Sequence, residues 1–149
     1  MELSKYLLLV AGILSFSVAL FQAVITFSPA WSLYFGAPEV LVSNISLLYL
    51  TGFIATVFFM IFGLYALSGV GLIRRLPLLR IGLLGIGSLY VLRGSVIIPI
   101  LLMIMGYFQF SEPIPATALS SSLVSLIIGL FYLIGTITSW QRLQLKMKK

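Results

Sequence analysis

Residues 81–105 read IGLLGIGSLYVLRGSVIIPILLMIM, an apolar run whose only charged side chain, Arg93, lies at its midpoint. A helix needs about 20 apolar residues to cross the hydrocarbon core of a bilayer, so this run is long enough. Fourteen of its residues are Leu, Ile or Val. Each of these favours insertion by about 0.3–0.6 kcal/mol, whereas a central arginine opposes it by about 2.5–3.5 kcal/mol. The run therefore predicts a membrane-spanning helix that carries an arginine near mid-membrane.

Three further apolar runs of similar length contain no charged residue, and they cover residues 6–27, 45–67 and 119–140. Together with residues 81–105 they predict an all-α integral membrane protein, a bundle of four transmembrane helices in a single membrane domain of residues 1–149. A signal peptide is the alternative interpretation of the first run, with cleavage after Ala19. The apolar residues continue well past that position, which favours a span.

The composition agrees with a membrane protein and excludes several kinds of chemistry. Hydrophobic residues make up 61% of the chain and charged residues 8%, against roughly 45–50% and 25% in soluble proteins. The sequence contains no His, Cys or Asp. Zinc, haem and iron–sulfur ligation and thiol chemistry therefore lack their ligands, and a catalytic triad lacks its base and its orienting acid. We expect no catalytic residue, no metal and no cofactor.

Positive charges gather on one side of the expected bundle. Eight of the nine Lys and Arg residues lie near the N-terminus, between the second and third spans or in the C-terminal tail, whereas the opposite loops contain Glu39 and Glu112. The positive-inside rule then places both termini in the cytoplasm. The net charge of +6 reflects this topology, so no nucleic-acid partner is expected. The layout resembles that of small bacterial inner-membrane proteins, which predicts the bacterial cytoplasmic membrane.

The connection after the first span is expected to form a short helix. Ser28 and Pro29 are typical of an N-cap and a first helical position, and Gly36 is typical of a C-cap, which predicts a helix over residues 29–35. Its aromatic side chains are of the kind enriched at membrane surfaces: Trp31, Tyr34 and Phe35. We interpret this segment as an interfacial anchor, and a lid over a site is the alternative.

Small and polar residues mark the packing faces of the spans. In the first span, small residues recur every four positions from Ala11 to Ala23, which allows helices to approach closely in lipid. In the third span, Pro99 cannot donate a backbone hydrogen bond to Ser95, which predicts a kink one turn beyond Arg93. The fourth span has the sharpest polar face, which must point into protein or water: Ser121, Ser125, Gly129, Tyr132, Thr136 and Ser139.

Arg93 is the residue around which we expect a site. A short connection makes the third and fourth spans antiparallel neighbours, and helical side chains lean toward the N-terminus of their helix, so Arg93 and Tyr132 should converge. The predicted ligand-binding pocket contains Arg93, Tyr90, Ser125 and Tyr132, with Gly129 leaving space beside them. No span carries a carboxylate to pair with the arginine, which indicates an anion from outside the chain.

Two alternatives to an external anion remain at this stage. Arg93 would only lock the bundle if it hydrogen-bonds to carbonyls and hydroxyls. It would pair within the chain if a loop folds inward and brings Glu39 or Glu112 to it.

Three functional classes are compatible with these features. The first is a non-enzymatic protein that binds a lipid-like or anionic hydrophobic ligand, or that acts as an accessory subunit of a membrane complex. The second is an oligomeric transporter or channel for an anionic or neutral solute, with the polar face of the fourth span along its path. The third is a lipid-modifying enzyme, which the missing residue types disfavour. Expected partners are membrane lipids, a small anionic ligand, and a second copy or a larger membrane complex.

Overall fold

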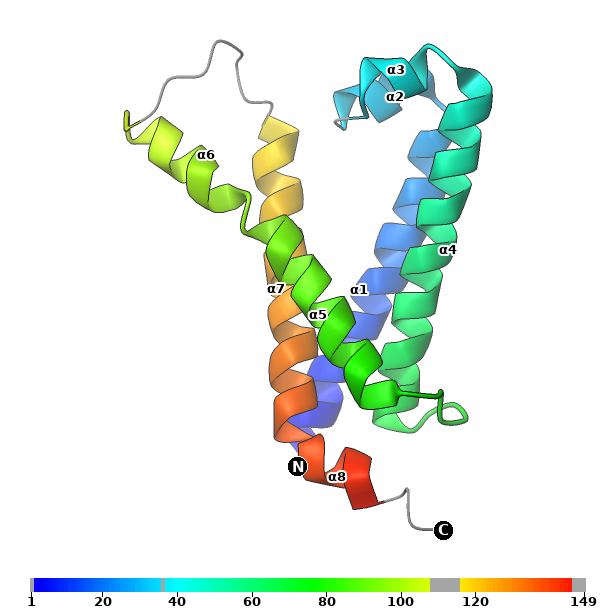
Figure 1. The fold of residues 1–149 in the computed structure, drawn as a ribbon, viewed down its shortest axis with the longest axis vertical. Helices are drawn as coiled ribbons and strands as arrows, with labels where there is room; N and C mark the ends of the chain where they lie inside the picture. Colours follow the sequence, from blue (N-terminus) through cyan, green and yellow to red (C-terminus); the bar gives the residue numbers. More distant parts are fainter. Residues whose placement is uncertain (1, 36, 108–115, 146–149) are drawn as a thin grey trace.

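The computed structural model describes residues 2–35, 37–107 and 116–145 (Figure 1). Within these ranges it is entirely helical apart from connecting loops. The helices are, in chain order, α1 (Glu2–Thr26), α2 (Pro29–Tyr34), α3 (Glu39–Val42), α4 (Ile45–Val70), α5 (Leu79–Gly94), α6 (Ile97–Ile104), α7 (Ala116–Thr138) and α8 (Trp140–Leu145).

Four helical segments are long and apolar enough to cross a membrane: Leu3–Thr26, Ile45–Val70, Leu79–Leu102 and Thr117–Thr138. Their ends lie within three residues of the ranges expected from the sequence, so the prediction of an all-α bundle with four spans is confirmed. Many large apolar side chains remain exposed on the outer surface of the bundle, as expected where lipid tails surround it. By the length and composition of its helices, the chain is a multi-pass membrane protein.

The four spans form two antiparallel hairpins, α1 with α4 and α5 with α7, arranged like a V (Figure 1). At the closed end of the V lie the start of α1, the loop between α4 and α5, and α8. At the open end lie α2, α3 and α6. The two hairpins touch mainly through α1 and α7. The described segments that carry Lys5, Arg74, Arg75 and Arg80 lie at the closed end, and the assignment of that end to the cytoplasm stays a prediction of the positive-inside rule.

The third span is broken where the proline predicted a kink. Helix α5 ends at Gly94 and α6 begins at Ile97, and the carbonyl of Ser95 accepts its hydrogen bond from Ile98 N at 2.9 Å. Pro99 lies in the first turn of α6, where its missing N–H costs least. The break allows α6 to diverge from α7 at the open end (Figure 1).

The observed bounds of the third span, Leu79–Leu102, change the expected depth of Arg93. The residue lies in the last turn of α5, 14 residues after Leu79. At 1.5 Å per residue this is about 21 Å along the helix, within a hydrocarbon core of about 30 Å. Arg93 therefore lies past the midpoint of the span, toward the open end of the V.

The expected short helix after the first span is present as α2, and a second one, α3, follows it. Ser28 occupies the N-cap position and Pro29 the first turn, as predicted, although the Ser28 side chain makes no capping hydrogen bond. Phe35 occupies the C-cap position of α2, while Gly36, the expected C-cap, lies outside the described residues. The two helices together fold back over the open end of the first hairpin (Figure 1).

Arginines hold α8 at the closed end. The guanidinium of Arg80 lies 4.9 Å from the ring centroid of Trp140, and its Nη2 donates to the Trp140 carbonyl at 3.3 Å. Arg75 Nη1 donates to the Leu143 carbonyl at 3.5 Å. Leu143 is among the last four residues of α8, whose carbonyl groups have no partner within that helix, so the contact from Arg75 satisfies one of them.

Glycines bring α5 and α7 into backbone contact. A Cβ atom placed on Gly129 would lie 2.7 Å from the backbone nitrogen of Val91, and one placed on Gly94 would lie 2.7 Å from the Cα of Leu126. Such contacts are closer than real Cβ atoms make, so only glycine allows this approach. The expectation that Gly129 leaves space beside the site is therefore wrong, because the backbone of α5 fills that space.

A chain of hydroxyl groups links all four spans. The Tyr132 hydroxyl donates to the Phe62 carbonyl of α4 at 2.8 Å and lies 3.0 Å from Ser15 Oγ of α1. Ser15 Oγ also lies 3.3 Å from the Tyr90 hydroxyl of α5. Because each hydroxyl carries one proton, Ser15 must donate to Tyr132 and Tyr90 must donate to Ser15. The direction of the chain is thus Tyr90, Ser15, Tyr132, Phe62.

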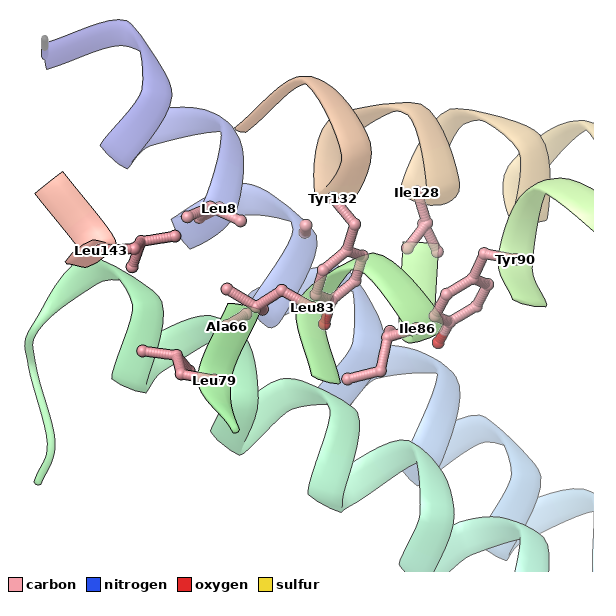
Figure 2. Close-up of a cluster of buried hydrophobic side chains, with 10 residues drawn as sticks. Leu8, Ala66, Leu79, Leu83, Ile86, Tyr90, Ile128, Tyr132 and Leu143 are labelled. Carbon is pink, nitrogen blue, oxygen red and sulfur yellow. The ribbon is translucent and has the colours of Figure 1, made fainter. Parts of the chain in front are cut away.

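The two tyrosine rings lie in a cluster of buried apolar side chains at the core of the bundle. Their centroids are 5.9 Å apart and their planes differ by 10°. Figure 2 shows both rings among Leu83, Ile86 and Ile128, with the hydroxyl groups directed away from the helices that carry them. The cluster as a whole contains residues of every span and of α8, so it joins the two hairpins.

Replacement of Gly129 by alanine is expected to loosen the bundle. The new Cβ would meet the backbone of α5, and overpacking of this kind typically costs about 1–3 kcal/mol. The matched control is Gly85→Ala, because a Cβ on Gly85 meets nothing within 4 Å. Unfolding by SDS in mixed micelles should show a lower free energy for Gly129→Ala and no loss for Gly85→Ala. Equal stability of the two variants would contradict the backbone contact.

Replacement of Tyr132 by phenylalanine is expected to cut the hydroxyl chain. The variant removes the link to the Phe62 carbonyl and leaves Ser15 without its acceptor. Interhelical hydrogen bonds in membranes contribute about 0.6 kcal/mol on average and up to about 1.7 kcal/mol, so we expect a loss in that range. Tyr6→Phe is the control, since Tyr6 is an exposed tyrosine of α1. A loss of stability no greater than that of the control, measured by the same SDS titration, would show that the chain contributes nothing.

Candidate functional site

The structure places the four predicted site residues on one pair of helices but at different depths. Helices α5 and α7 are antiparallel neighbours, as the short connection predicted. Arg93, Tyr90 and Ser125 line a common cleft between the hairpins. Tyr132 does not line the cleft. It is fully buried, and its ring is stacked on that of Tyr90. The structure thus brings Arg93, Tyr90 and Ser125 together in one cleft. Tyr132 instead lies in the buried core, packed against Tyr90.

The cleft has a volume of about 380 Å³, and its part nearer the closed end of the V is mainly apolar. Its floor is formed by four side chains, one from each span: Leu14, Phe59, Tyr90 and Ile128. Its walls come from α1 and α7, and they include Phe21 and Val124, which are 44% and 45% exposed. Because wall residues and Arg93 are exposed, the cleft communicates with the surroundings of the bundle.

A second cavity of about 240 Å³ lies beneath α2 and α3, between α1 and α4. This cavity is lined by several uncharged polar side chains: Gln22, Thr26, Ser32 and Thr51. We call the larger cavity the cleft and this one the polar chamber. The two cavities are adjacent, since four residues line both: Gln22, Ile25, Phe35 and Arg93.

Arg93 therefore lies at the junction between an apolar cleft and a polar chamber. Within residues 2–35, 37–107 and 116–145, its guanidinium makes no hydrogen bond or salt bridge. Glu39 is exposed in α3 and lines neither cavity. Glu112, the other candidate partner, lies outside the described residues. In the described part of the chain, a cation thus stands without a counter-charge in a segment that spans the membrane, an arrangement that is costly unless an anion joins it.

The polar face of the fourth span points mainly into protein. The Thr136 hydroxyl donates to the Tyr132 carbonyl at 2.6 Å and is fully buried, and a Cβ on Gly135 would meet Leu8 of α1. Further toward the open end, Ser121 and Ser125 line the cleft, and the Ser125 hydroxyl donates to the Ser121 carbonyl at 2.8 Å. Within one bundle, this face forms part of a closed core and one wall of the cleft.

The segment after the first span combines the two roles that the sequence left open. Trp31 and Tyr34 are 57% and 66% exposed, as expected for an interfacial anchor. Phe35 instead lies against Phe21, with ring centroids 4.9 Å apart, and lines both cavities. Thr117 at the start of α7 donates to the Tyr34 carbonyl at 3.1 Å, so α2 also bridges the two hairpins. The segment therefore covers the polar chamber in addition to facing outward.

Sequence reasoning missed most of the polar chamber. Gln22 carries an amide, which is unusual in an apolar span. That amide was the one feature of the sequence that could have indicated the polar chamber. Thr51 and Ser32 look like ordinary hydroxyl residues of a helix and a connection, and only the packing of α1, α2 and α4 brings them together.

No family model matches the chain, and no curated protein or solved structure matches it either. The functional argument therefore depends on the geometry and chemistry of the two cavities.

Proposed function

We propose that this membrane protein binds an anionic, lipid-like ligand in the cleft between its hairpins, and that it does so without catalysing a reaction. The observation that carries the proposal is the position of Arg93, whose guanidinium lies at the junction of two cavities with no partner among the described residues. An anionic group bound there would supply the missing counter-charge.

The shape and lining of the cleft support a ligand with an apolar portion. Small-molecule sites have volumes of about 300–1,000 Å³ and are lined mostly by apolar side chains with a few polar groups that fix orientation, and the cleft of about 380 Å³ meets this description. Tyr90 belongs to the apolar floor, and Arg93 lies three residues later on α5, a helix that runs from the closed end of the V toward the open end. A ligand with a charged end and an apolar tail matches this gradient.

The other functional classes have less support. A lipid-modifying enzyme that used a hydroxyl nucleophile would need a general base to activate it, and the described cavity linings contain no carboxylate, imidazole or amine. An oligomeric transporter would need a polar path, whereas most of the polar face of the fourth span is packed inside one bundle. An accessory subunit stays compatible with the geometry, because an acidic group of a partner would also satisfy Arg93.

The setting of this activity is also part of the proposal. The ligand would come from the lipids of the membrane that holds the protein, which we propose to be a bacterial cytoplasmic membrane. A second copy, or a larger membrane complex, would cover those sides of the cleft that one bundle leaves exposed.

Native mass spectrometry of the protein released from mild detergent tests this function. The wild-type protein should retain an anionic lipid, and Arg93→Gln should lose it, because the counter-charge is removed. Arg74→Gln is the matched control, since Arg74 is exposed in the loop at the closed end and lines neither cavity. The control should retain the lipid at the wild-type level.

Two results would contradict the proposal. Equal lipid retention by wild type and Arg93→Gln would show that Arg93 does not hold the ligand. If Arg93 instead pairs with Glu112, the variants Arg93→Gln and Glu112→Gln should lower the melting temperature equally, and neither should change the bound lipid.

A further inference from the structure

The polar chamber allows the headgroup of the ligand to be described, an inference that rests on the proposed function. A bare carboxylate would need only Arg93, which is already accessible from the cleft. The structure in addition contains a polar cavity of about 240 Å³ that Arg93 also lines. The chemistry of that cavity limits what can occupy it.

The hydroxyl groups of the chamber have already used their protons. The Thr51 hydroxyl donates to the Leu47 carbonyl at 2.7 Å, and the Ser32 hydroxyl donates to the Ile25 carbonyl at 2.8 Å. The Thr26 hydroxyl likewise donates to a backbone carbonyl, that of Gln22, at 2.7 Å. Since a hydroxyl carries one proton and two lone pairs, each of these oxygens can offer the chamber only an acceptor.

Gln22 adds a further acceptor beside Arg93. Its amide nitrogen lies 3.5 Å from Thr26 Oγ1, a long hydrogen bond, and its carbonyl oxygen has no partner within the described residues. The chamber therefore combines several acceptor oxygens with one cation and the second N–H of the Gln22 amide. A complementary headgroup carries a negative charge for Arg93 and hydroxyl donors for the acceptors.

The distance from the chamber to the floor of the cleft fits the first part of an acyl chain. Gln22 lines both cavities, and Leu14 of the floor lies eight residues earlier in α1. At 1.5 Å per residue, these levels are about 12 Å apart along the helix. We propose that the site takes a polyol phosphodiester lipid, such as a phosphoglycerol lipid, with its hydroxyl-bearing headgroup in the polar chamber, its phosphate at Arg93 and one acyl chain in the cleft.

The test compares two lipids that differ only in headgroup hydroxyls. Lysophosphatidylglycerol and lysophosphatidylpropanol of the same chain length both carry one negative phosphodiester and a three-carbon headgroup, but only the first has hydroxyl groups on the headgroup. We expect the full-length protein in detergent to bind the glycerol form about 25-fold more tightly, because each of two additional hydrogen bonds of ordinary strength would contribute about fivefold. Titration followed by native mass spectrometry measures both dissociation constants.

Variants of the chamber should reduce this preference without abolishing binding. Thr51→Val keeps the shape of the side chain and removes one acceptor, so the ratio of the two affinities should fall by about fivefold, the value of one hydrogen bond. Gln22→Leu should act in the same direction. Thr56→Val is the matched control, because the Thr56 hydroxyl also donates to a carbonyl of its own helix, at 2.8 Å from the Gly52 oxygen, but lines neither cavity.

The outcomes separate the two proposals. Equal affinity for both lipids in the wild type, with both lost in Arg93→Gln, would overturn the headgroup assignment and leave the anionic site in place. A preference that Thr51→Val and Thr56→Val change equally would also overturn it. Binding of both lipids that Arg93→Gln does not weaken would overturn the anionic site, and the headgroup assignment with it.

Discussion

The bundle depends on the hydroxyl chain that runs from Tyr90 through Ser15 and Tyr132 to the Phe62 carbonyl. In a bilayer, helices gain little from hiding apolar surface from one another, because lipid tails are as apolar as leucine. Close packing and interhelical hydrogen bonds must then hold the spans together. The hydroxyl chain contains one group from each span. Because each hydroxyl has a single proton, its hydrogen bonds can run in only one direction. It therefore fixes how the four helices are rotated about their axes, and the core in Figure 2 packs around it.

The candidate site follows from the position of that chain. Tyr90 belongs both to the chain and to the floor of the cleft, and Arg93 lies three residues later on the same face of α5. Beyond Arg93, the helix is interrupted before Pro99, so α6 no longer follows α7 (Figure 1). The tyrosine that takes part in the hydroxyl chain thus also forms part of the floor of the cleft. Because the third span is broken, α6 diverges from α7 and leaves the cleft open toward the open end of the V. One helix supplies the floor, the cation and the break.

The sequence predicted those features that depend on a single helix or on two consecutive ones. Hydropathy located the spans, and helical periodicity placed Arg93 and Tyr90 on one face. The antiparallel pairing of α5 and α7 added Ser125. Features that need a third helix were missed. Tyr132 became part of the buried core because Ser15 comes from the other hairpin. Gly129 was interpreted wrongly because a glycine in a helix can either leave an empty space or let a neighbouring helix come close. Only the distance between the two helices tells which of these occurs, and here α5 comes close.

The arginines at the closed end show what a structural role looks like in this protein. Arg80 packs on the ring of Trp140 and donates to its carbonyl, and Arg75 donates to the Leu143 carbonyl, so both guanidinium groups hold α8 in place. If Arg93 only locked the bundle, the same kind of contact would be expected at the break after Gly94, where carbonyl groups lie nearby. Among the described residues it makes none, and its guanidinium lies between two cavities. The contrast within one chain favours a ligand as the partner of Arg93.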